Sequence, residues 1–275
     1  MFTIVTITFN ADQVLSKTIE SVYSQTNTDY EYFIIDGKSS DNTVTIAKKY
    51  ESSFQKKGVL YYILSEKDSG IYNAMNKAIK LAHNKWIMFM NAGDCFLDDK
   101  TLENVKKRIN KDAIVVYGDV VLCKNNMYKY SKAKPLVELR TGMVFCHQSS
   151  FVCTAWAKNH VFDEKYKYAA DYEMMLSAYL ANCNFQYIDF PFAIYECGGV
   201  STKNAYAFKR EFLEIQRNLG LMSMQDYLDK EELINKYERK SKILELITSC
   251  IPLRFRMRYV IRKQKKTGWK ANTCL

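Results

Sequence analysis

The chain has 275 residues, of which 48% are hydrophobic and 14% aromatic, with only 3 prolines and 10 glycines. This composition supports a sizeable packed core and excludes a disordered, fibrous or low-complexity chain. The formal net charge of +10 lies mostly at one end, because eight Lys and Arg residues and no acidic residue follow Glu245, which leaves +2 for the residues before it.

The first half of the chain alternates short apolar runs with helical patterns. Strands are expected, in chain order, over residues 3–8, 32–35, 59–64 and 86–90. Helices are expected over residues 14–22, 41–50 and 70–83, with Asn10 or Asp12 capping the first and Asp41 the second. Met1–Phe9 lacks the basic start and the cleavage site of a secretory signal. This alternation predicts βαβ units and a mostly parallel α/β sheet.

The second half of the chain is less regular. Strands are expected over residues 114–121, 128–131, 185–188 and 194–196. A helix is expected over 170–180, and the chain has a helical pattern from about residue 205, with a bend at Gly220. Because no Pro- or Ser-rich linker interrupts it, we expect one α/β domain over residues 1–204 and a C-terminal helical extension over 205–275.

Two carboxylates directly follow predicted strands. Asp36 ends the strand in IIDGKSSDNT, and Asp94 ends NAGD after the strand WIMFM. Ligands bind beyond the carboxyl ends of parallel strands, so both side chains are candidates for one site. Asp36 could accept a hydrogen bond from a nucleobase or a ribose. Asp41 already explains the capping in that loop, and Gly37 permits close approach of a ligand.

Asp94 is a candidate ligand for Mn²⁺ or Mg²⁺, which prefer oxygen ligands and often share them with substrate phosphates. Such a cation would neutralise a diphosphate leaving group. The alternative is that Asp94 caps the segment that starts near Leu97. Asp68 precedes the helix that opens at Gly70, where it could cap that helix or face the same nucleotide.

Asp171 and Glu173 open the helical pattern ADYEMML. Helix positions two apart do not share a face, so these carboxylates are not expected to act as a pair. One of them would point at a cleft, where it could take the proton of a sugar hydroxyl. Asp171 fits this role and the role of a capping residue equally well.

Three further polar segments have weaker patterns. His147 and Gln148 follow an apolar stretch in FCHQSSF, and a lone His is more often structural than a ligand. Gly199 and Ser201 in GGVS belong either to a phosphate-binding loop or to a flexible turn. The three histidines lack H-x-x-x-H spacing, which argues against zinc. The absence of G-x-G-x-x-G and G-K-[ST] argues against a dinucleotide enzyme and a P-loop NTPase.

Together these segments resemble the family-2 glycosyltransferases with the GT-A fold, in particular bacterial enzymes of surface-polysaccharide assembly. The matching segments occur in family order over residues 1–201 and read TIVTITFNA, IIDGKSSDNT, SEKDSGIYNAMNKAI, FMNAGD, HQSSF, AADYEMML and GGVS. The resemblance implies a Rossmann-like GT-A catalytic domain, with a nucleotide-binding part over about 1–95 and an acceptor part over about 96–204. One departure is that NAGD has a single carboxylate where many relatives have D-A-D-D, which puts the strength of metal binding in doubt.

The resemblance also implies a role for each candidate residue in an inverting transfer from a nucleoside diphosphate sugar, with UDP as the preferred nucleotide. Asp94 would bind the divalent cation, Mn²⁺ or Mg²⁺, and Asp171 would be the general base. The nucleotide-binding residues would be Thr8, Asn10, Asp36, Asp68, Gly70 and Asn91. The residues that contact the diphosphate or the acceptor would be His147, Gln148, Gly199 and Ser201.

The C-terminal segment ITSCIPLRFRMRYVIRKQKK combines basic with apolar residues, and Arg254, Arg258 and Arg262 are four apart. It predicts a basic amphipathic helix on an anionic membrane surface, with a solvated tail as the alternative. The nearly neutral remainder predicts no nucleic-acid partner. A glycan acceptor carried on a polyprenyl diphosphate, which the resemblance suggests, agrees with this surface.

The expected location is cytoplasmic, peripheral on the inner face of the cell membrane. No apolar run of about 18 residues predicts a transmembrane helix, and the eight cysteines contain no C-x-x-C pair, as suits reduced thiols. Two other functions remain open. A non-catalytic nucleotide-sugar-binding scaffold would explain the reduced acidic motif. A sugar-phosphate nucleotidyltransferase would favour a Gly- and Arg-rich loop near the N-terminus, where the chain reads NADQVLSK.

Overall fold

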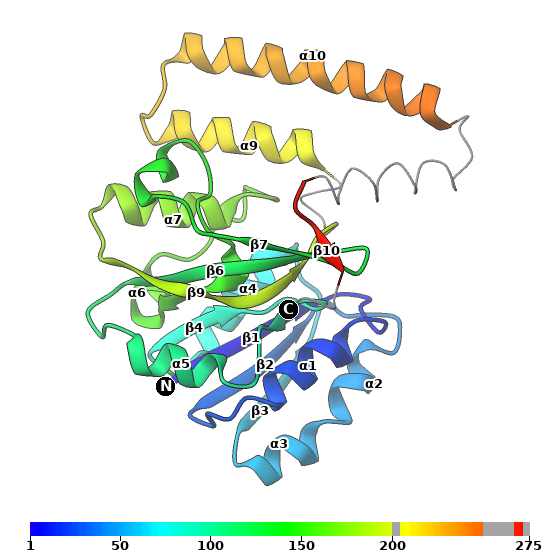
Figure 1. Ribbon diagram of the computed structural model, residues 1–275, viewed down its shortest axis with the longest axis vertical. Helices are drawn as coiled ribbons and strands as arrows, with labels where there is room; N and C mark the ends of the chain where they lie inside the picture. Colours follow the sequence, from blue (N-terminus) through cyan, green and yellow to red (C-terminus); the bar gives the residue numbers. More distant parts are fainter. Residues whose placement is uncertain (200–203, 250–266, 272–275) are drawn as a thin grey trace. The chain divides into compact units, whose positions relative to one another are not determined.

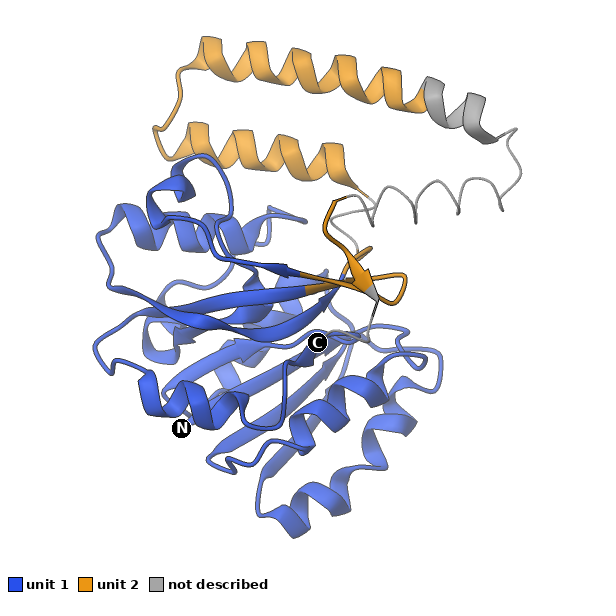
Figure 2. Cartoon of the chain, viewed as in Figure 1, with its two compact units in different colours: residues 1–121, 130–196 blue, residues 122–129, 197–275 orange. Residues whose placement is uncertain are grey.

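The structure is a computed structural model, and it describes residues 1–199, 204–249 and 267–271. The chain forms two compact units, one of residues 1–121 with 130–196 and one of residues 122–129 with 197–275 (Figure 2). The expected division at residue 204 stays a prediction.

The first unit is an α/β domain with a mixed central sheet (Figure 1). The strands of the sheet are β1 (Phe2–Thr8), β2 (Tyr30–Asp36), β3 (Leu60–Ser65), β4 (Trp86–Phe89), β5 (Cys95–Phe96), β6 (Val115–Lys124), β7 (Met127–Ser131), β8 (Ser150–Cys153) and β9 (Phe185–Glu196). Residues 122–124 of β6 and 127–129 of β7 belong to the second unit. The order β6-β8-β4-β1-β2-β3 places β1 between β4 and β2. β1 to β4 are parallel, whereas β8 and β6 are antiparallel to their neighbours. The predicted mostly parallel core of the first half is therefore confirmed.

The register of the parallel strands aligns their carboxyl ends. Thr8 of β1 lies opposite Asp36 of β2, and Asp36 lies opposite Ser65 of β3. β4 ends at Phe89, which lies opposite Val5 of β1, and the chain continues into the NAGD turn, where the amide of Ala92 donates to the carbonyl of Ile7. The loops after these strands therefore meet at one edge, as expected of a parallel sheet.

Helices cover both faces of this sheet. They are α1 (Leu15–Tyr23), α2 (Thr43–Lys48), α3 (Glu51–Lys57), α4 (Ile71–Leu81), α5 (Thr101–Arg108), α6 (Thr154–Asn159) and α7 (Ala170–Leu180), with short 3₁₀ turns η1 (Leu136–Arg140) and η2 (His147–Ser149). Alternate strand residues, such as Ile4 and Met88, pack with Leu15 of α1 and Phe54 of α3 in one buried cluster. On the opposite face Phe89 contacts His147 of η2. The period-two pattern of the strands thus separates a structural core from the face that carries the candidate catalytic residues.

The second unit contains a helical hairpin and a short strand. Its elements are α9 (Ala205–Asn218), α10 (Met224–Ser249) and β10 (Lys270–Ala271), which pairs antiparallel with β7. Gly220, at φ 73°, lies in the turn between the helices, which confirms the predicted break. Arg210 of α9 forms an ion pair with Glu238 of α10. No helix in the described ranges is both long enough and apolar enough to cross a membrane.

Several predicted boundaries differ from the structure. Asn10 and Asp12 do not cap α1, whose N-cap is Val14, because the chain turns through a left-handed Asn10 (φ 48°) before the helix starts. The helix predicted over 41–50 is two helices, α2 and α3, and the second continues to Lys57. The two strands predicted on either side of Pro191 are one strand, β9, since proline removes an N–H donor but is compatible with extended backbone.

Candidate functional site

Asp36 is buried at the carboxyl end of β2, with 1% of its surface exposed. Its carboxylate accepts hydrogen bonds from the amide and hydroxyl of Ser39 and from the hydroxyl of Ser65, the last at 2.6 Å. These donors fix the carboxylate at the strand-end edge. The predicted N-cap Asp41 stands one residue before the N-cap of α2, which is Asn42, although its carboxylate accepts from the amide of Thr43, the first residue of α2.

The loop after β1 is tied to the loop after β2. The amide of Asn10 donates to the hydroxyl of Ser39 at 2.7 Å, and the side-chain oxygen of Asn10 accepts from the amide of Ser40 at 2.9 Å. The carbonyl of Thr8 accepts from the amide of Gly37. The Thr8 hydroxyl is buried and has no hydrogen-bond partner within the described residues. The structure therefore brings Thr8, Asn10 and Asp36 together.

Asp68 lies against the same loop. Its Oδ1 accepts from the amide of Gly70, the N-cap of α4, at 3.0 Å. Its Oδ2 lies 2.6 Å from where a Cβ on Gly37 would stand, and the ring of Phe9 lies 3.3 Å from that same point. Phe9 is 65% exposed, and sequence reasoning missed it, because an aromatic residue at a strand end has no local signal. The carboxylates of Asp36 and Asp68, the glycines Gly37 and Gly70, and the exposed ring of Phe9 therefore lie close together around the loop after β2.

Asp94 is buried after β4, with 4% of its surface exposed. The hydroxyl of Thr18 on α1 accepts from the amide of Gly93 and donates to the carbonyl of Asp94, which fixes the NAGD turn. Burial raises the pKa of Asp94 to about 7. This value already includes the charge of the nearby Glu196 carboxylate, which raises the pKa, and a hydrogen bond from the Glu196 amide at 2.9 Å and the charge of Lys17, which lower it.

Glu196 is the second acidic residue at this turn, and sequence reasoning missed it. It ends β9, which pairs with β5 directly after Asp94 and so brings the two residues together from 102 positions apart. NAGD alone contains one carboxylate, but the folded turn has two carboxylates beside it. The side-chain oxygen of Asn91 is also buried there, with no partner among the described residues.

These oxygen atoms fit a divalent cation that is shared with a substrate. No group of three His, Cys, Asp or Glu side chains in the described part of the chain is arranged to hold a metal ion by itself. Mg²⁺ and Mn²⁺ commonly take one or two protein carboxylates and complete their shell with water and substrate phosphates. Asp94 and the unpartnered Asn91 oxygen have the right chemistry for this arrangement.

Asp171 lies in the first turn of α7. Its Oδ1 accepts a hydrogen bond from the hydroxyl of Tyr72 at 3.0 Å. Glu173 accepts instead from Ser177 on its own helix at 2.8 Å. The two carboxylates therefore bond to different elements, and Asp171 is the one that faces another element.

His147 is buried beside Asp171, with 7% of its surface exposed. Its ring stacks on Phe89 at 5.4 Å and meets Phe162 edge-on at 5.9 Å. Burial lowers the pKa of His147, and the charge of Asp171 opposes that shift. The lowered pKa favours the neutral ring, and both ring nitrogens are buried and lack a hydrogen-bond partner among the described residues.

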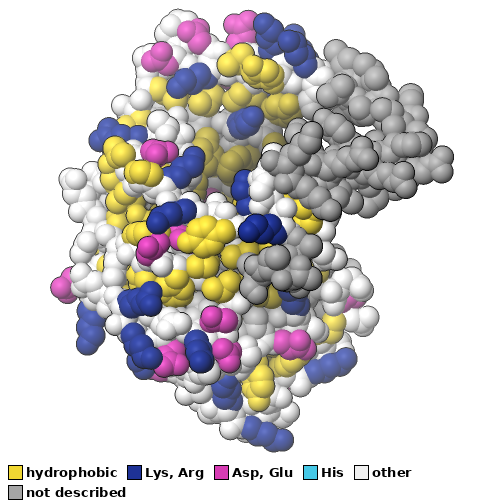
Figure 3. All heavy atoms as spheres, viewed as in Figure 1, with side chains coloured by type: hydrophobic (Ala, Val, Ile, Leu, Met, Phe, Trp, Pro, Cys, Tyr) yellow, Lys and Arg dark blue, Asp and Glu magenta, His cyan; other side chains and the backbone are white. Residues whose placement is uncertain are grey.

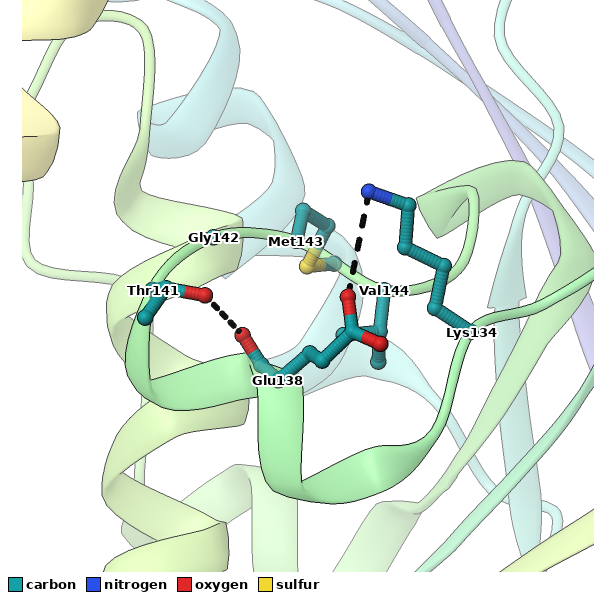
Figure 4. A pocket seen from close by; sticks show the side chains of 6 residues that line it. All are labelled: Lys134, Glu138, Thr141, Gly142, Met143 and Val144. Atoms are coloured by element: carbon teal, nitrogen blue, oxygen red, sulfur yellow. Dashed lines mark hydrogen bonds and ion pairs between the residues drawn. The ribbon is translucent and has the colours of Figure 1, made fainter.

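The remaining candidates are placed less centrally. Gln148 is buried in η2 and accepts from the thiol of Cys146. Gly199 belongs to the second unit, in a bend after β9, and Ser201 lies outside the described residues. A separate small pocket in the first unit contains none of the predicted site residues (Figure 4). Its walls are formed by Lys134, Glu138, Thr141, Gly142, Met143 and Val144.

A parallel sheet with carboxylates gathered at its strand ends, and one more carboxylate on a neighbouring helix, is the arrangement of the GT-A glycosyltransferases. The mixed α/β fold matches structures of that class. It belongs to glycosyl transferase family 2, whose family model matches residues 3–166.

The curated relatives are glycosyltransferases of several kinds. A PGL/p-HBAD biosynthesis glycosyltransferase of Mycobacterium bovis is 31% identical over 153 residues, which cover 55% of this chain and 58% of the relative. The chondroitin synthase of Escherichia coli is 27% identical over 179 residues, 61% of this chain and 25% of the synthase. The matches thus span less than two thirds of the length of these relatives.

Solved structures share the fold at low identity. S. aureus TarS 1-349 in complex with UDP has a TM-score of 0.60 at 18% identity, covering 94% of this chain and 77% of TarS. The mannosyltransferase PcManGT from Pyrobaculum calidifontis, in complex with GDP-Man and Mn²⁺, has a TM-score of 0.62 at 12% identity. It covers 86% of this chain and 69% of that protein.

Proposed function

We propose that the protein transfers a sugar, with inversion, from a UDP-sugar to a hydroxyl of a glycan or lipid-linked acceptor. One observation carries this proposal. The first turn of α4 joins the carboxylate loop at Asp68 and Gly70 to Asp171, because Tyr72 in that turn donates to Asp171. The first turn of α4 therefore contacts both the proposed nucleotide-binding loop, through Gly70, and the proposed general base, through Tyr72.

The donor nucleotide would bind at the strand-end edge. Asp36 and Asp68 would accept hydrogen bonds from the base and the ribose, and the exposed Phe9 ring would stack on the base. The other contacts would come from Thr8, Asn10, Gly70 and Asn91. Uracil is the preferred base, because S. aureus TarS has been crystallised with UDP and with UDP-GlcNAc and shares this fold.

Asp171 would act as the general base. It would take the proton of the acceptor hydroxyl while that oxygen attacks the anomeric carbon, and the bond to the diphosphate would break on the opposite side. His147, which is neutral and unpartnered, would donate to an acceptor or diphosphate oxygen, together with Gln148, Gly199 and Ser201. The loop that contains η1 supports an acceptor side here, since its Leu139 carbonyl accepts from Tyr172, the neighbour of Asp171.

A divalent cation, Mn²⁺ or Mg²⁺, would be held by Asp94 with Asn91. When bound, it would stabilise the negative charge of the departing diphosphate. The chain's own contribution is to keep Asp94 fixed through Thr18 and to exclude water from it, since the carboxylate is almost fully buried.

The basic tail would attach the enzyme to the anionic inner face of the cell membrane, where a polyprenyl-diphosphate-linked acceptor would be reached. On the face shown in Figure 3, basic and acidic side chains of the described residues are interspersed. The tail, which lies largely outside the described residues, is the one sequence segment with a strong excess of one sign. Replacing Arg254, Arg258 and Arg262 with Gln should weaken binding to vesicles that contain anionic lipid. Unchanged binding would contradict this role.

Calorimetric binding of UDP and of GDP, with and without Mn²⁺, tests the proposed function. We expect Mn²⁺-dependent binding of UDP that is lost in Asp94→Ala. Binding of GDP alone would move the proposal to a different donor. A folded protein that binds neither nucleotide would contradict the donor site. Nucleotide binding without turnover of any UDP-sugar would favour a non-catalytic scaffold.

A further inference from the structure

Tyr72 connects two elements that are far apart in the sequence. It is the second residue of α4 and is 8% exposed, and its hydroxyl donates to Asp171, 99 residues later, at 3.0 Å. Its ring packs on Phe162 at a centroid distance of 5.3 Å. A tyrosine that only filled space would not need its hydroxyl at this carboxylate.

The ring that supports Tyr72 is itself fixed. The buried Asn76, one turn along α4, donates to the carbonyl of Phe162 and accepts from its amide, both at 2.9 Å. Glu164 then accepts from Asn73 and Asn76, and from Ser69 before the helix. The segment that leads into α7 is therefore fastened to α4 at several points, which leaves the Tyr72 hydroxyl little freedom relative to Asp171.

We propose that Tyr72 is a positioning residue that holds the carboxylate of Asp171 in one orientation. The proposal rests on the proposed function for the identity of Asp171 as the base. The Tyr72 hydroxyl occupies Oδ1, and Oδ2 accepts no hydrogen bond within the described part of the chain. One oxygen is thus fixed and the other is available to an acceptor hydroxyl, which is the geometry that a general base requires.

A hydroxyl that donates to a carboxylate forms a charge-assisted hydrogen bond, which is stronger than a neutral one and holds the acceptor oxygen in place. The other charged or titratable groups near Asp171 come from different elements. Glu173 on α7 is engaged by Ser177, Arg140 of η1 lies over the ring of Tyr179, and His147 of η2 stacks on Phe89.

The test compares release of UDP from UDP-GlcNAc by the wild-type full chain and by Tyr72→Phe, which keeps the ring on Phe162. We expect kcat to fall about tenfold in Tyr72→Phe, with KM within about twofold of wild type, because the base loses one charge-assisted hydrogen bond that orients it. The matched control is Tyr61→Phe, which removes a hydroxyl that donates to the Ala47 carbonyl, and it should leave kcat unchanged.

The same variants, labelled at the aspartate carboxyl carbons, are measured by ¹³C NMR at one fixed pH. The Asp171 resonance, assigned as the one that is missing in Asp171→Asn, should move in Tyr72→Phe and stay in place in Tyr61→Phe. An unchanged kcat or an unmoved resonance in folded Tyr72→Phe overturns the proposal. Failure of the wild-type protein to release UDP contradicts the proposed function instead, and the position of the resonance still decides whether Tyr72 holds Asp171.

Discussion

The carboxylate of Asp68 stands against the backbone of Gly37, so that a Cβ at position 37 would come within 2.6 Å of Asp68 Oδ2. Such a distance is not tolerated between unbonded atoms, and one of the two groups would have to move. The glycine therefore sets how closely the loops after β2 and β3 approach each other. Because Asp36 immediately precedes it, the same glycine also fixes the separation of the two carboxylates.

Gly37→Ala should displace Asp68 and weaken UDP binding about tenfold, with a smaller effect on the free energy of unfolding. Calorimetry and urea denaturation give both quantities. Asp68→Ala and the double variant separate the causes. If the steric clash is responsible, adding Gly37→Ala to Asp68→Ala should cause no further loss of affinity. An additional tenfold loss in the double variant would contradict this explanation.

Asp94 should make the stability of the metal-free protein depend on pH. Its pKa is about 7 in the folded protein against an ordinary value of 3.8, so the folded chain binds more protons than the unfolded chain between these values. The free energy of unfolding should therefore fall as pH rises through this window, by at most about 1.4 kcal/mol per pH unit. Urea unfolding in EDTA at pH 5.5 and pH 7.5 measures it. Asp94→Asn should lose this dependence, and an equal slope in that variant would contradict the assignment.

Glu196→Gln should weaken Mn²⁺ binding in the presence of UDP by about tenfold, less than Asp94→Asn does. The variant keeps the backbone amide that donates to Asp94 but removes the negative charge beside it. Calorimetric titration of Mn²⁺ into the UDP-bound protein measures the change. Asp189→Asn is the matched control, since Asp189 is an exposed carboxylate on the same strand. Equal effects of the two variants would mean that Glu196 has no specific role at this turn.

Asp171→Asn should abolish sugar transfer while leaving UDP binding within about twofold of wild type. The amide can accept the hydrogen bond from Tyr72 but cannot take a proton at neutral pH. Release of UDP from UDP-GlcNAc is a suitable first assay. Wild-type turnover by this variant would show that Asp171 is not the base.

Asn76→Ala should destabilise the first unit by about 2–4 kcal/mol. Its side chain satisfies the buried amide and carbonyl of Phe162, and each group left unsatisfied costs about 1–3 kcal/mol. Urea denaturation measures the loss. Asn73→Ala is the control on the same helix, because Asn73 bonds only to the Glu164 side chain near the surface, and it should cost less than about 1 kcal/mol.

The sequence was sufficient for features that depend on local pattern. The strand-end positions of Asp36 and Asp94 followed from apolar runs that stop at a carboxylate, and the helix that opens near Asp171 followed from its periodicity. Asn76, by contrast, has the sequence pattern of a solvated helix face but is buried, 5% exposed, because the segment around Phe162 covers it.

Contacts between distant residues could not be predicted in this way. Glu196 meets Asp94 only because β9 pairs with β5, and Tyr72 meets Asp171 only because the fold brings the first turn of α4 to the first turn of α7. Neither pairing has a signal within a window of sequence. The single carboxylate of NAGD therefore suggested a weaker acidic site than the folded turn provides.

The cross-ties between the loops after β1 and β2 have a consequence for how fast a ligand binds. Asn10 is bonded to Ser39 and Ser40, and the amide of Ala11 donates to the hydroxyl of Thr43, so the protein's own groups hold these loops. Little conformational entropy is then left to lose on association, and no slow ordering step precedes contact. Rapid mixing with UDP should show one phase whose rate rises linearly with nucleotide concentration, as expected for a preorganised binding site.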